Sequence, residues 1–222
     1  APNTAFRYAE TQSHLASGLA RLIYNYKERY VLTTTYRLDG SSKFRGANKW
    51  AHFPSFAFAW RANEETWFRA PVISMLKLRL GWGRVGNQAI SSYQTMSNYN
   101  FDTWPSHVPG NNAHYTPGMY PDNVANPNLK WETTEQTNLG LDFAMWRGRF
   151  TLTVDAYYKN TKDLLQNKNI STSSGYATMW MNIGNISNRG IEFTLDTTPV
   201  KIGGFEWQLG GNISFNRNRI EK

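Results

Sequence analysis

The segment Phe205–Asn216, which reads FEWQLGGNISFN, alternates apolar and polar residues along its length. One side of the extended chain carries Phe205, Trp207, Leu209, Gly211, Ile213 and Phe215. Successive side chains of a β-strand point to opposite faces, so the segment predicts a strand with one apolar and one polar face. In a soluble sandwich the apolar face packs on a protein core, whereas in an outer-membrane barrel it faces lipid.

The composition is typical of a chain built from such strands. Charged residues make up 18% of the 222 residues, below the roughly 25% of soluble domains, and aromatic residues make up 15%. The mean hydropathy is nevertheless −0.58. No stretch reaches the roughly 18 apolar residues of a transmembrane helix, which excludes a helical membrane protein. Cysteine is absent, which excludes disulfides, thiolate metal sites and a cysteine nucleophile.

Seven further segments resemble the first one, although Leu15–Tyr26 is poorly phased. With the first, the predicted strands are Leu15–Tyr26, Tyr30–Asp39, Phe56–Arg61, Leu76–Gly83, Asn138–Met145, Phe150–Lys159, Ile191–Asp196 and Phe205–Asn216. Only the region Glu64–Ser74 is expected to contain helix. The sequence therefore predicts an all-β fold of about eight antiparallel strands.

The connections between these strands alternate in length. The short ones are Lys27–Arg29, Arg147–Arg149 and Val200–Gly204, one of medium length is 63–75, and the long ones are 40–53, 85–135 and 161–188. Consecutive antiparallel strands place alternate connections at opposite ends of a sheet, so one end has tight turns and the other has large loops. Outer-membrane barrels have this arrangement, with short periplasmic turns and longer external loops.

Aromatic residues lie near the ends of the apolar strand faces, as in the aromatic belts of membrane barrels. They are Tyr24, Tyr26, Tyr30, Trp60, Trp82, Trp146 and Trp207. This placement favours a barrel. The alternative, a soluble β-sandwich that binds carbohydrate or peptide, remains open on the pattern alone.

No motif predicts catalysis, a cofactor or a metal. Gly81–Gly86 fits G-x-G-x-x-G, but residues 87–93 do not provide the amphipathic helix that a dinucleotide site requires. Among the histidines, only His107 and His114 share a loop. Glu132 and Glu135, three residues apart in a strand, point to opposite faces and cannot act as an acid/base pair. The net charge of +8 is scattered, so we expect no nucleic-acid partner.

The loop Ser91–Asn128 is rich in aromatic residues set among Asn, Pro and Gly. Flat rings beside amide groups suit stacking on sugars or holding a peptide. The predicted substrate contacts are Tyr99, Trp104 and Tyr115. The alternative is a compact loop that packs on its own aromatic side chains.

Several short motifs occur in the order found in one transporter family. They include YNYKERY (24–30), RLDGSSKF (37–44), KWAHFPS (49–55), LKLRLGWG (76–83), NPNLKWE (126–132), NLGLD (138–142), DAYY (155–158) and GNISNRGIE (184–192). By these motifs the chain resembles the SusC/RagA type of TonB-dependent outer-membrane transporter. The resemblance covers nearly all of the chain from about residue 19 onward.

The resemblance implies an importer of glycans or peptides in the outer membrane of a Gram-negative bacterium. It implies a 22-strand barrel with an internal plug, energised through the TonB complex and closed by a SusD-like surface lipoprotein. Residues 1–222 match barrel wall only, so we expect neither the plug nor the remaining strands here. The residues expected to face outer-membrane lipids are Leu152, Val154, Trp207, Leu209 and Ile213.

Overall fold

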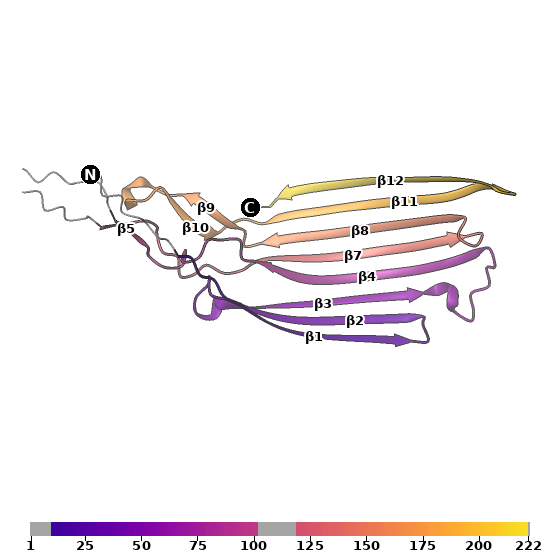
Figure 1. Cartoon of the computed structure of the whole chain (residues 1–222), viewed down its shortest axis with the longest axis horizontal. Coiled ribbons are helices and arrows are strands. Elements are labelled where there is room, and N and C mark those ends of the chain that lie inside the picture. The colour runs from indigo at the N-terminus through magenta and orange to yellow at the C-terminus, as the bar shows by residue number, and fades with distance from the viewer. Residues whose placement is uncertain (1–9, 102–118, 222) are drawn as a thin grey trace, which may run out of the picture.

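The computed structural model describes residues 10–101 and 119–221, and its main element is one antiparallel sheet (Figure 1). Its eight strands lie side by side in chain order, which confirms the predicted number and pairing. They are β1 (Leu15–Tyr26), β2 (Tyr30–Ser41), β3 (Trp50–Arg61), β4 (Ile73–Asn87), β7 (Glu132–Met145), β8 (Phe150–Lys162), β11 (Ile186–Ile202) and β12 (Phe205–Ile220).

Short elements occupy the connections at one end of the sheet. Two small ladders pair β5 (Tyr99–Phe101) with β6 (Met119–Pro121), and β9 (Leu165–Asn169) with β10 (Thr178–Asn182). The 3-10 turns η1 (Gly46–Lys49) and η3 (Thr172–Ser174) lie at the same end, whereas η2 (Ala62–Glu64) follows β3 at the opposite end (Figure 1). The expectation of helix within Glu64–Ser74 is wrong, because turns follow η2 there.

Tight turns close the other end, called here the turn end. In the β1–β2 turn, Lys27 and Glu28 have φ values of 52° and 56°, and in the β7–β8 turn Trp146 and Arg147 have φ values of 52° and 59°. Successive left-handed residues give a turn whose twist matches that of the flanking strands. These turns set the register of each hairpin, and the long connections all gather at the opposite end, called the loop end (Figure 1).

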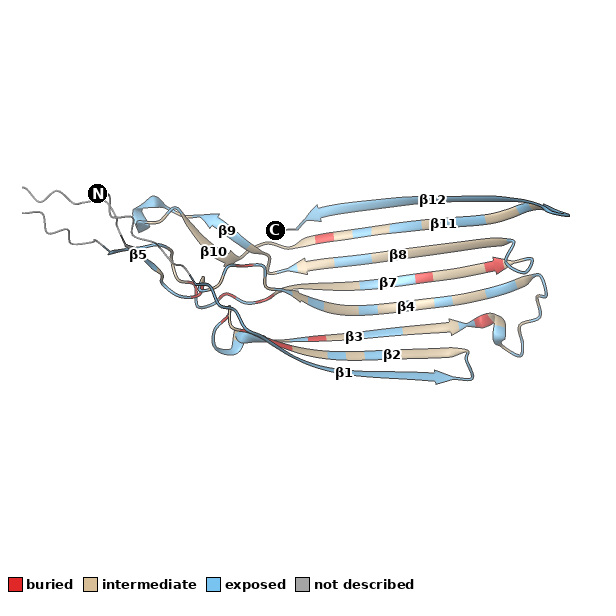
Figure 2. Cartoon of the chain, viewed as in Figure 1, coloured by how far each residue is buried: buried red, intermediate tan, exposed pale blue. Residues whose placement is uncertain are grey.

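The sheet is a single curved layer (Figure 1). Within the described residues, no second sheet covers either of its faces. Buried residues are few along the long strands and concentrate near the loop end (Figure 2). The sandwich alternative is therefore wrong, because a sandwich buries its apolar strand faces between two packed sheets.

Candidate transport surfaces

The strand ladders gather the apolar side chains on one side of the sheet. Directly paired residues of neighbouring strands point to the same side of the sheet. Leu195 is paired with Leu152, and Phe193 is paired with Val154 on one side and Ile213 on the other, so the apolar side chains form rows across β8, β11 and β12. This apolar face consists chiefly of Leu22, Leu32, Phe58, Leu78, Leu80, Leu139, Leu141, Phe143, Leu152, Val154, Ala156, Ile191, Phe193, Leu195, Trp207, Leu209, Ile213 and Phe215. All five residues predicted to face lipid belong to it.

Aromatic side chains border the apolar face at both ends. Near the turn end lie Tyr26, Tyr30 and Trp60, which the β1–β2 and β2–β3 ladders pair with one another. Toward the loop end lie Trp82 and Tyr158, each paired with Thr137 of β7. Phe150 and Tyr158 are eight residues apart on β8, about 27 Å along a strand, which is a suitable length for a strand crossing a bilayer at a tilt.

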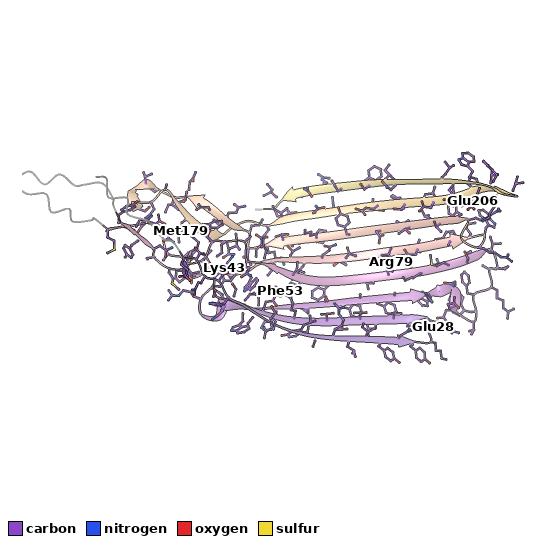
Figure 3. The ribbon with its side chains drawn as sticks, in the orientation of Figure 1. Glu28, Lys43, Phe53, Arg79, Met179 and Glu206 are labelled. Atoms are coloured by element: carbon purple, nitrogen blue, oxygen red, sulfur yellow. The ribbon has the colours of Figure 1, made fainter. Side chains whose placement is uncertain are left out.

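The opposite side, called the polar face, carries an ion-pair cluster at its centre (Figure 3). Arg79 Nε and Nη2 each lie 2.9 Å from an oxygen of Asp142, and Nη2 also lies 2.9 Å from Asp155 Oδ1. Lys77 Nζ lies 3.7 Å from Asp142 Oδ2. Gly140 allows this arrangement, because a Cβ there would lie 2.6 Å from Arg79 Cζ. Alternation in the sequence predicted that these four charged residues share the polar face. It did not predict that they contact one another.

Small residues line a trough beside this cluster on the polar face. The trough has a volume of about 280 Å³ and runs over β2, β3, β4 and β7. Its floor includes Thr33, Ala57, Ala59 and Gly81. The polar face is therefore shaped by short side chains around a fixed set of charges.

At the turn end, one carboxylate ties two of the aromatic residues to the β3–β4 connection. Glu65 accepts hydrogen bonds from the Tyr30 hydroxyl and, at 3.1 Å, from Trp60 Nε1. Arg29 Nη1 lies 3.5 Å from Glu65 Oε2. The hydrogen bond from Tyr30, followed by that from Trp60 and the charge of Arg29, lowers the pKa of Glu65 below its usual value.

The loop end contains a small hydrophobic core, called here the loop core. It consists of Phe44, Phe53, Ile90, Leu129 and Trp131, which come from three separate segments of the chain. β3 pairs with β4 only as far as Ser55 and Gly83, so these strands part toward the loop end. Gly86 makes room for the core, because a Cβ there would lie 2.1 Å from Phe53 Cζ.

Hydrogen bonds join the three long connections around the loop core. Trp131 Nε1 donates to Lys49 O at 3.2 Å, and Asn126 Nδ2 donates to Trp180 O at 2.8 Å. Asn182 Nδ2 donates to Lys130 O at 2.9 Å, and its Oδ1 accepts from Lys130 N at 3.0 Å. The long connections therefore form one packed cap over the end of the sheet.

The predicted substrate contacts fall in different parts of the structure. Tyr99 lies in β5, on this cap, and is 56% exposed. Trp104 and Tyr115 lie outside the described residues. Tyr93 and Tyr120 of the same loop are exposed, and the loop core takes its rings from Phe44, Phe53 and Trp131.

The glycine motif and the glutamate pair singled out in the sequence lie within the strands of the sheet. Gly81–Gly86 lies within β4, which ends at Asn87 without a following helix. Glu132 and Glu135 make separate contacts, Glu132 with Asn87 and Glu135 with Arg84 and Lys162. In the described residues no group of three or more His, Asp or Glu side chains is placed to hold a metal ion. No helix in that part of the chain is long and apolar enough to cross a membrane.

A single family model spans the chain. The family described as TonB dependent receptor-like, beta-barrel, matches residues 1–221, and the chain belongs to this family. The all-β fold predicted from the alternating strands is thereby confirmed as a segment of this barrel, and the resemblance read from the sequence motifs is confirmed as well.

Curated relatives are similar over nearly the whole chain. The TonB-dependent receptor SusC of Bacteroides thetaiotaomicron is 38% identical over 215 residues, which cover 96% of this chain and 21% of that protein. The TonB-dependent receptor P26 of Formosa agariphila is 37% identical over 210 residues, covering 93% and 20%. The chain thus spans about a fifth of the length of these relatives.

Solved structures share the fold. The chain matches a structure of the RagAB peptide transporter with a TM-score of 0.82 at 24% identity, covering 94% of this chain and 22% of that one. It matches the siderophore receptor PirA from Pseudomonas aeruginosa with a TM-score of 0.61 at 16% identity, covering 94% and 35%. The eight-stranded sheet therefore corresponds to a part of larger receptor chains.

Proposed function

We propose that this chain forms part of the barrel wall of an outer-membrane importer that takes up glycans or peptides. Import is energised through the TonB complex, and a SusD-like surface lipoprotein assists it. The observation that carries the proposal is the single-layered sheet, whose apolar face is bordered by aromatic residues at both ends and left bare by the described chain. Membership of the TonB-dependent receptor family and the names of its SusC and RagAB relatives support it.

In this proposal the two faces of the sheet meet different surroundings. The apolar face, including Leu152, Val154, Trp207, Leu209 and Ile213, contacts the lipids of the outer membrane. The polar face lines the barrel interior, where the Arg79–Asp142–Asp155 cluster meets water or the plug. Burying such charges in lipid would be costly, whereas an aqueous or protein-filled interior accepts them.

The two ends of the sheet also have different roles. The tight turns face the periplasm, and the cap at the loop end faces the exterior, as in barrels of this kind. The exposed Tyr99 on this cap contacts cargo, with Trp104 and Tyr115 as further contacts in the same loop. Stacking of one aromatic side chain contributes about 1 kcal/mol, or roughly fivefold in affinity.

Uptake by the full-length protein tests this proposal. A strain lacking the gene is complemented with the wild-type protein or a variant and supplied with labelled oligosaccharides and peptides. We expect uptake of one of these cargo classes to be restored and to be abolished by a proton uncoupler. Tyr99→Ala should weaken cargo binding about fivefold. Tyr24→Ala is the matched control, because Tyr24 at the turn end is 55% exposed.

Two results would contradict the proposal. One is uptake of both cargo classes at wild-type rates in the strain without the gene. The other is a full-length protein recovered in the soluble fraction of the cells. Equal cargo affinity in the Tyr99→Ala variant and the wild type would remove Tyr99 alone from the cargo site.

A further inference from the structure

The trough on the polar face continues toward both ends of the sheet. Toward the loop end it shares Thr33, Ala57 and Gly81 with a hollow of about 390 Å³. Toward the turn end it shares Val31 and Ala59 with a hollow of about 440 Å³. The trough and the two hollows form one lengthwise depression of the polar face, called here the inner groove.

Short side chains of the central strands make the floor of the inner groove. Ser55, Ala57 and Ala59 take the inward positions of β3, and the ladder places Gly83 and Gly81 of β4 opposite the first two. Both strands have a neighbouring strand on each side. The depression therefore comes from the small size of these side chains and not from an edge of the sheet.

The charged residues that line the inner groove are mostly basic. Arg79 and Lys77 are held by the ion-pair cluster. Lys159 lines the loop-end hollow and Arg61 the turn-end hollow, and both are exposed. Within the described part of the chain, neither of these two has a carboxylate oxygen within 4.0 Å. Glu28, at the turn end (Figure 3), is the one acidic residue in the described lining.

The ladder leaves one of these cations directly opposite another. Arg61 is paired with Lys77, and like charges in directly opposed positions destabilise a pair of strands. Lys77 has a counter-charge in Asp142, at 3.7 Å. Glu192 and Asp196, the carboxylates of β11 on the polar face, lie on the far side of the ion-pair cluster. Positive charge is therefore left uncompensated along the inner groove, and negative charge lies beyond it.

We propose that the inner groove guides an acidic oligosaccharide, a chain of sugars that bear carboxylate groups, from the loop end toward the periplasm. Lys159 binds one carboxylate where the chain enters the groove, and Arg61 binds another near the turn end. Charge-assisted hydrogen bonds of this kind are roughly twice as strong as neutral ones. This inference rests on the proposed function and deepens it, because the polar face must line the barrel interior and the class of cargo is now named.

The neutral groups of the inner groove favour a sugar chain over a peptide. Gln136 and Asn138 line it with amides, and Thr33 and Ser55 line it with hydroxyls. These groups both donate and accept hydrogen bonds, as the hydroxyls of a sugar do. The alanines and glycines of the floor give the large side chains of a peptide little to pack against. A neutral sugar chain would leave the two unpaired cations without a counter-charge.

Trapping the cargo on its path tests the assignment of the groove. Energised cells that make the full-length protein with Ala59→Cys are given oligogalacturonate that carries a bromoacetyl group, and labelled protein is measured by its mass. We expect labelling at Ala59→Cys and none at Thr153→Cys, because Thr153 lies on the polar face of β8 and does not line the groove. The carboxyl-reduced chain with the same reactive group should label Ala59→Cys at least about tenfold less. Equal labelling by both chains, or none at Ala59→Cys, would overturn the proposal.

Removing the unpaired charges tests the two carboxylate contacts. Lys159→Gln/Arg61→Gln should lower the uptake of labelled oligogalacturonate at least about tenfold. Arg147→Gln/Arg149→Gln removes the same charge from a turn outside the groove and should leave uptake as in the wild type. Equal losses in both double variants would overturn the proposal, since they would show a general charge effect. Faster uptake of oligoglutamate than of oligogalacturonate by the wild type would overturn the choice of a sugar chain.

Filling the inner groove tests whether cargo needs its floor. Ala57→Phe should lower the uptake of oligogalacturonate severalfold, whereas Thr153→Phe, on the same face outside the groove, should not. Uptake is divided by the amount of each variant in the outer membrane. Unchanged uptake in Ala57→Phe would overturn the proposal. If Ala57→Phe does not reach the membrane, the labelling at Ala59→Cys, a much smaller change, decides the question.

The outcome for the groove is separable from the outcome for transport. If Lys159→Gln/Arg61→Gln imports oligogalacturonate like the wild type, this inference fails while the proposed function stands. The same holds if the wild type imports a neutral glycan or a peptide and excludes oligogalacturonate. If the wild type restores uptake of no glycan and no peptide, the proposed function fails first.

Discussion

The chain has two apolar regions, and they differ in what covers them. The loop core is enclosed by the chain itself, so Leu129 is 0% and Trp131 5% exposed. On the apolar face of the sheet, Leu209 is 47% and Leu80 43% exposed, and the described chain forms a single layer there (Figure 1). If water surrounded both regions, the exposed apolar side chains of the sheet would be unfavourable by the hydrophobic effect. The difference indicates two solvents: water around the loop end and, as we propose, lipid around the sheet.

The largest expected effect comes from removing a ring of the loop core. Trp131→Ala should lower the free energy of unfolding of the full-length barrel by about 3–5 kcal/mol, as large-to-small changes in packed cores do. Trp82→Ala is the control, because Trp82 lies on the apolar face, is 37% exposed and, in the function we propose, has lipid to fill the gap. Reversible unfolding in bilayers measures both. A larger cost for Trp82→Ala would reverse the comparison.

A smaller effect is expected from placing charge on the apolar face. Leu152→Arg should destabilise the barrel by about 2–4 kcal/mol if the side chain lies near the bilayer midplane. Thr153→Arg, one residue along β8 on the polar face, should cost clearly less, because that side chain meets the barrel interior. The same bilayer unfolding assay applies. Equal costs at the two positions would show that the apolar face does not contact lipid.

The smallest effect concerns the border of the apolar face at the turn end. The pKa of Glu65 is lowered by its hydrogen bonds from Tyr30 and Trp60. Its contribution to stability is therefore complete above the ordinary carboxyl pKa and is lost as pH falls through the lowered value. The protection of the backbone amides in the β3–β4 connection against hydrogen exchange, corrected for the intrinsic pH dependence of the exchange rate, should fall at acid pH in the wild type. In Glu65→Gln, which does not titrate, this part of the pH dependence should vanish, and an unchanged pH profile would contradict the assignment.

Alternation in the sequence was sufficient to predict the faces of seven of the eight long strands. Each of these repeats with period 2, and a shift by one residue would move all its apolar side chains to the other face. In Leu15–Tyr26 the alternation is poorly phased, because Leu19 and Ile23 lie on one side of the strand and Leu22 and Tyr24 on the other.

Strand ends were harder to predict. β11 begins at Ile186 rather than Ile191 and continues to Ile202 through an irregular register between Thr197 and Val200. Glycine, proline and polar residues at these ends weaken the apolar–polar alternation from which strands were predicted. Pairing with β8 and β12 nevertheless extends β11 through them.

The loop core and the contacts within the Arg79–Asp142–Asp155 cluster were not predicted, because both depend on distant pairing. Phe44, Ile90 and Leu129 are single apolar residues within long polar connections, without any periodicity of their own. Arg79, Asp142 and Asp155 become neighbours only through the β4–β7 and β7–β8 registers. The substrate contact Tyr99 stays a prediction, as do Trp104 and Tyr115. What alternation cannot supply is the alignment of segments that are far apart in the chain.

The separation of tight turns from long connections also has a consequence for chain entropy. The hairpins at the turn end fix the register within β1–β2, β7–β8 and β11–β12, and a continuous ladder of paired residues holds β4 against β7. The pairing of β4 with β7 therefore depends little on the length of the connection between them. Doubling the length of a flexible loop costs only about 0.6 kcal/mol in closure entropy. Residues inserted beyond the loop core, near β5 and β6, would leave the strand pairing unchanged. The surface at this end can therefore diverge in length and composition while the wall beneath it stays the same.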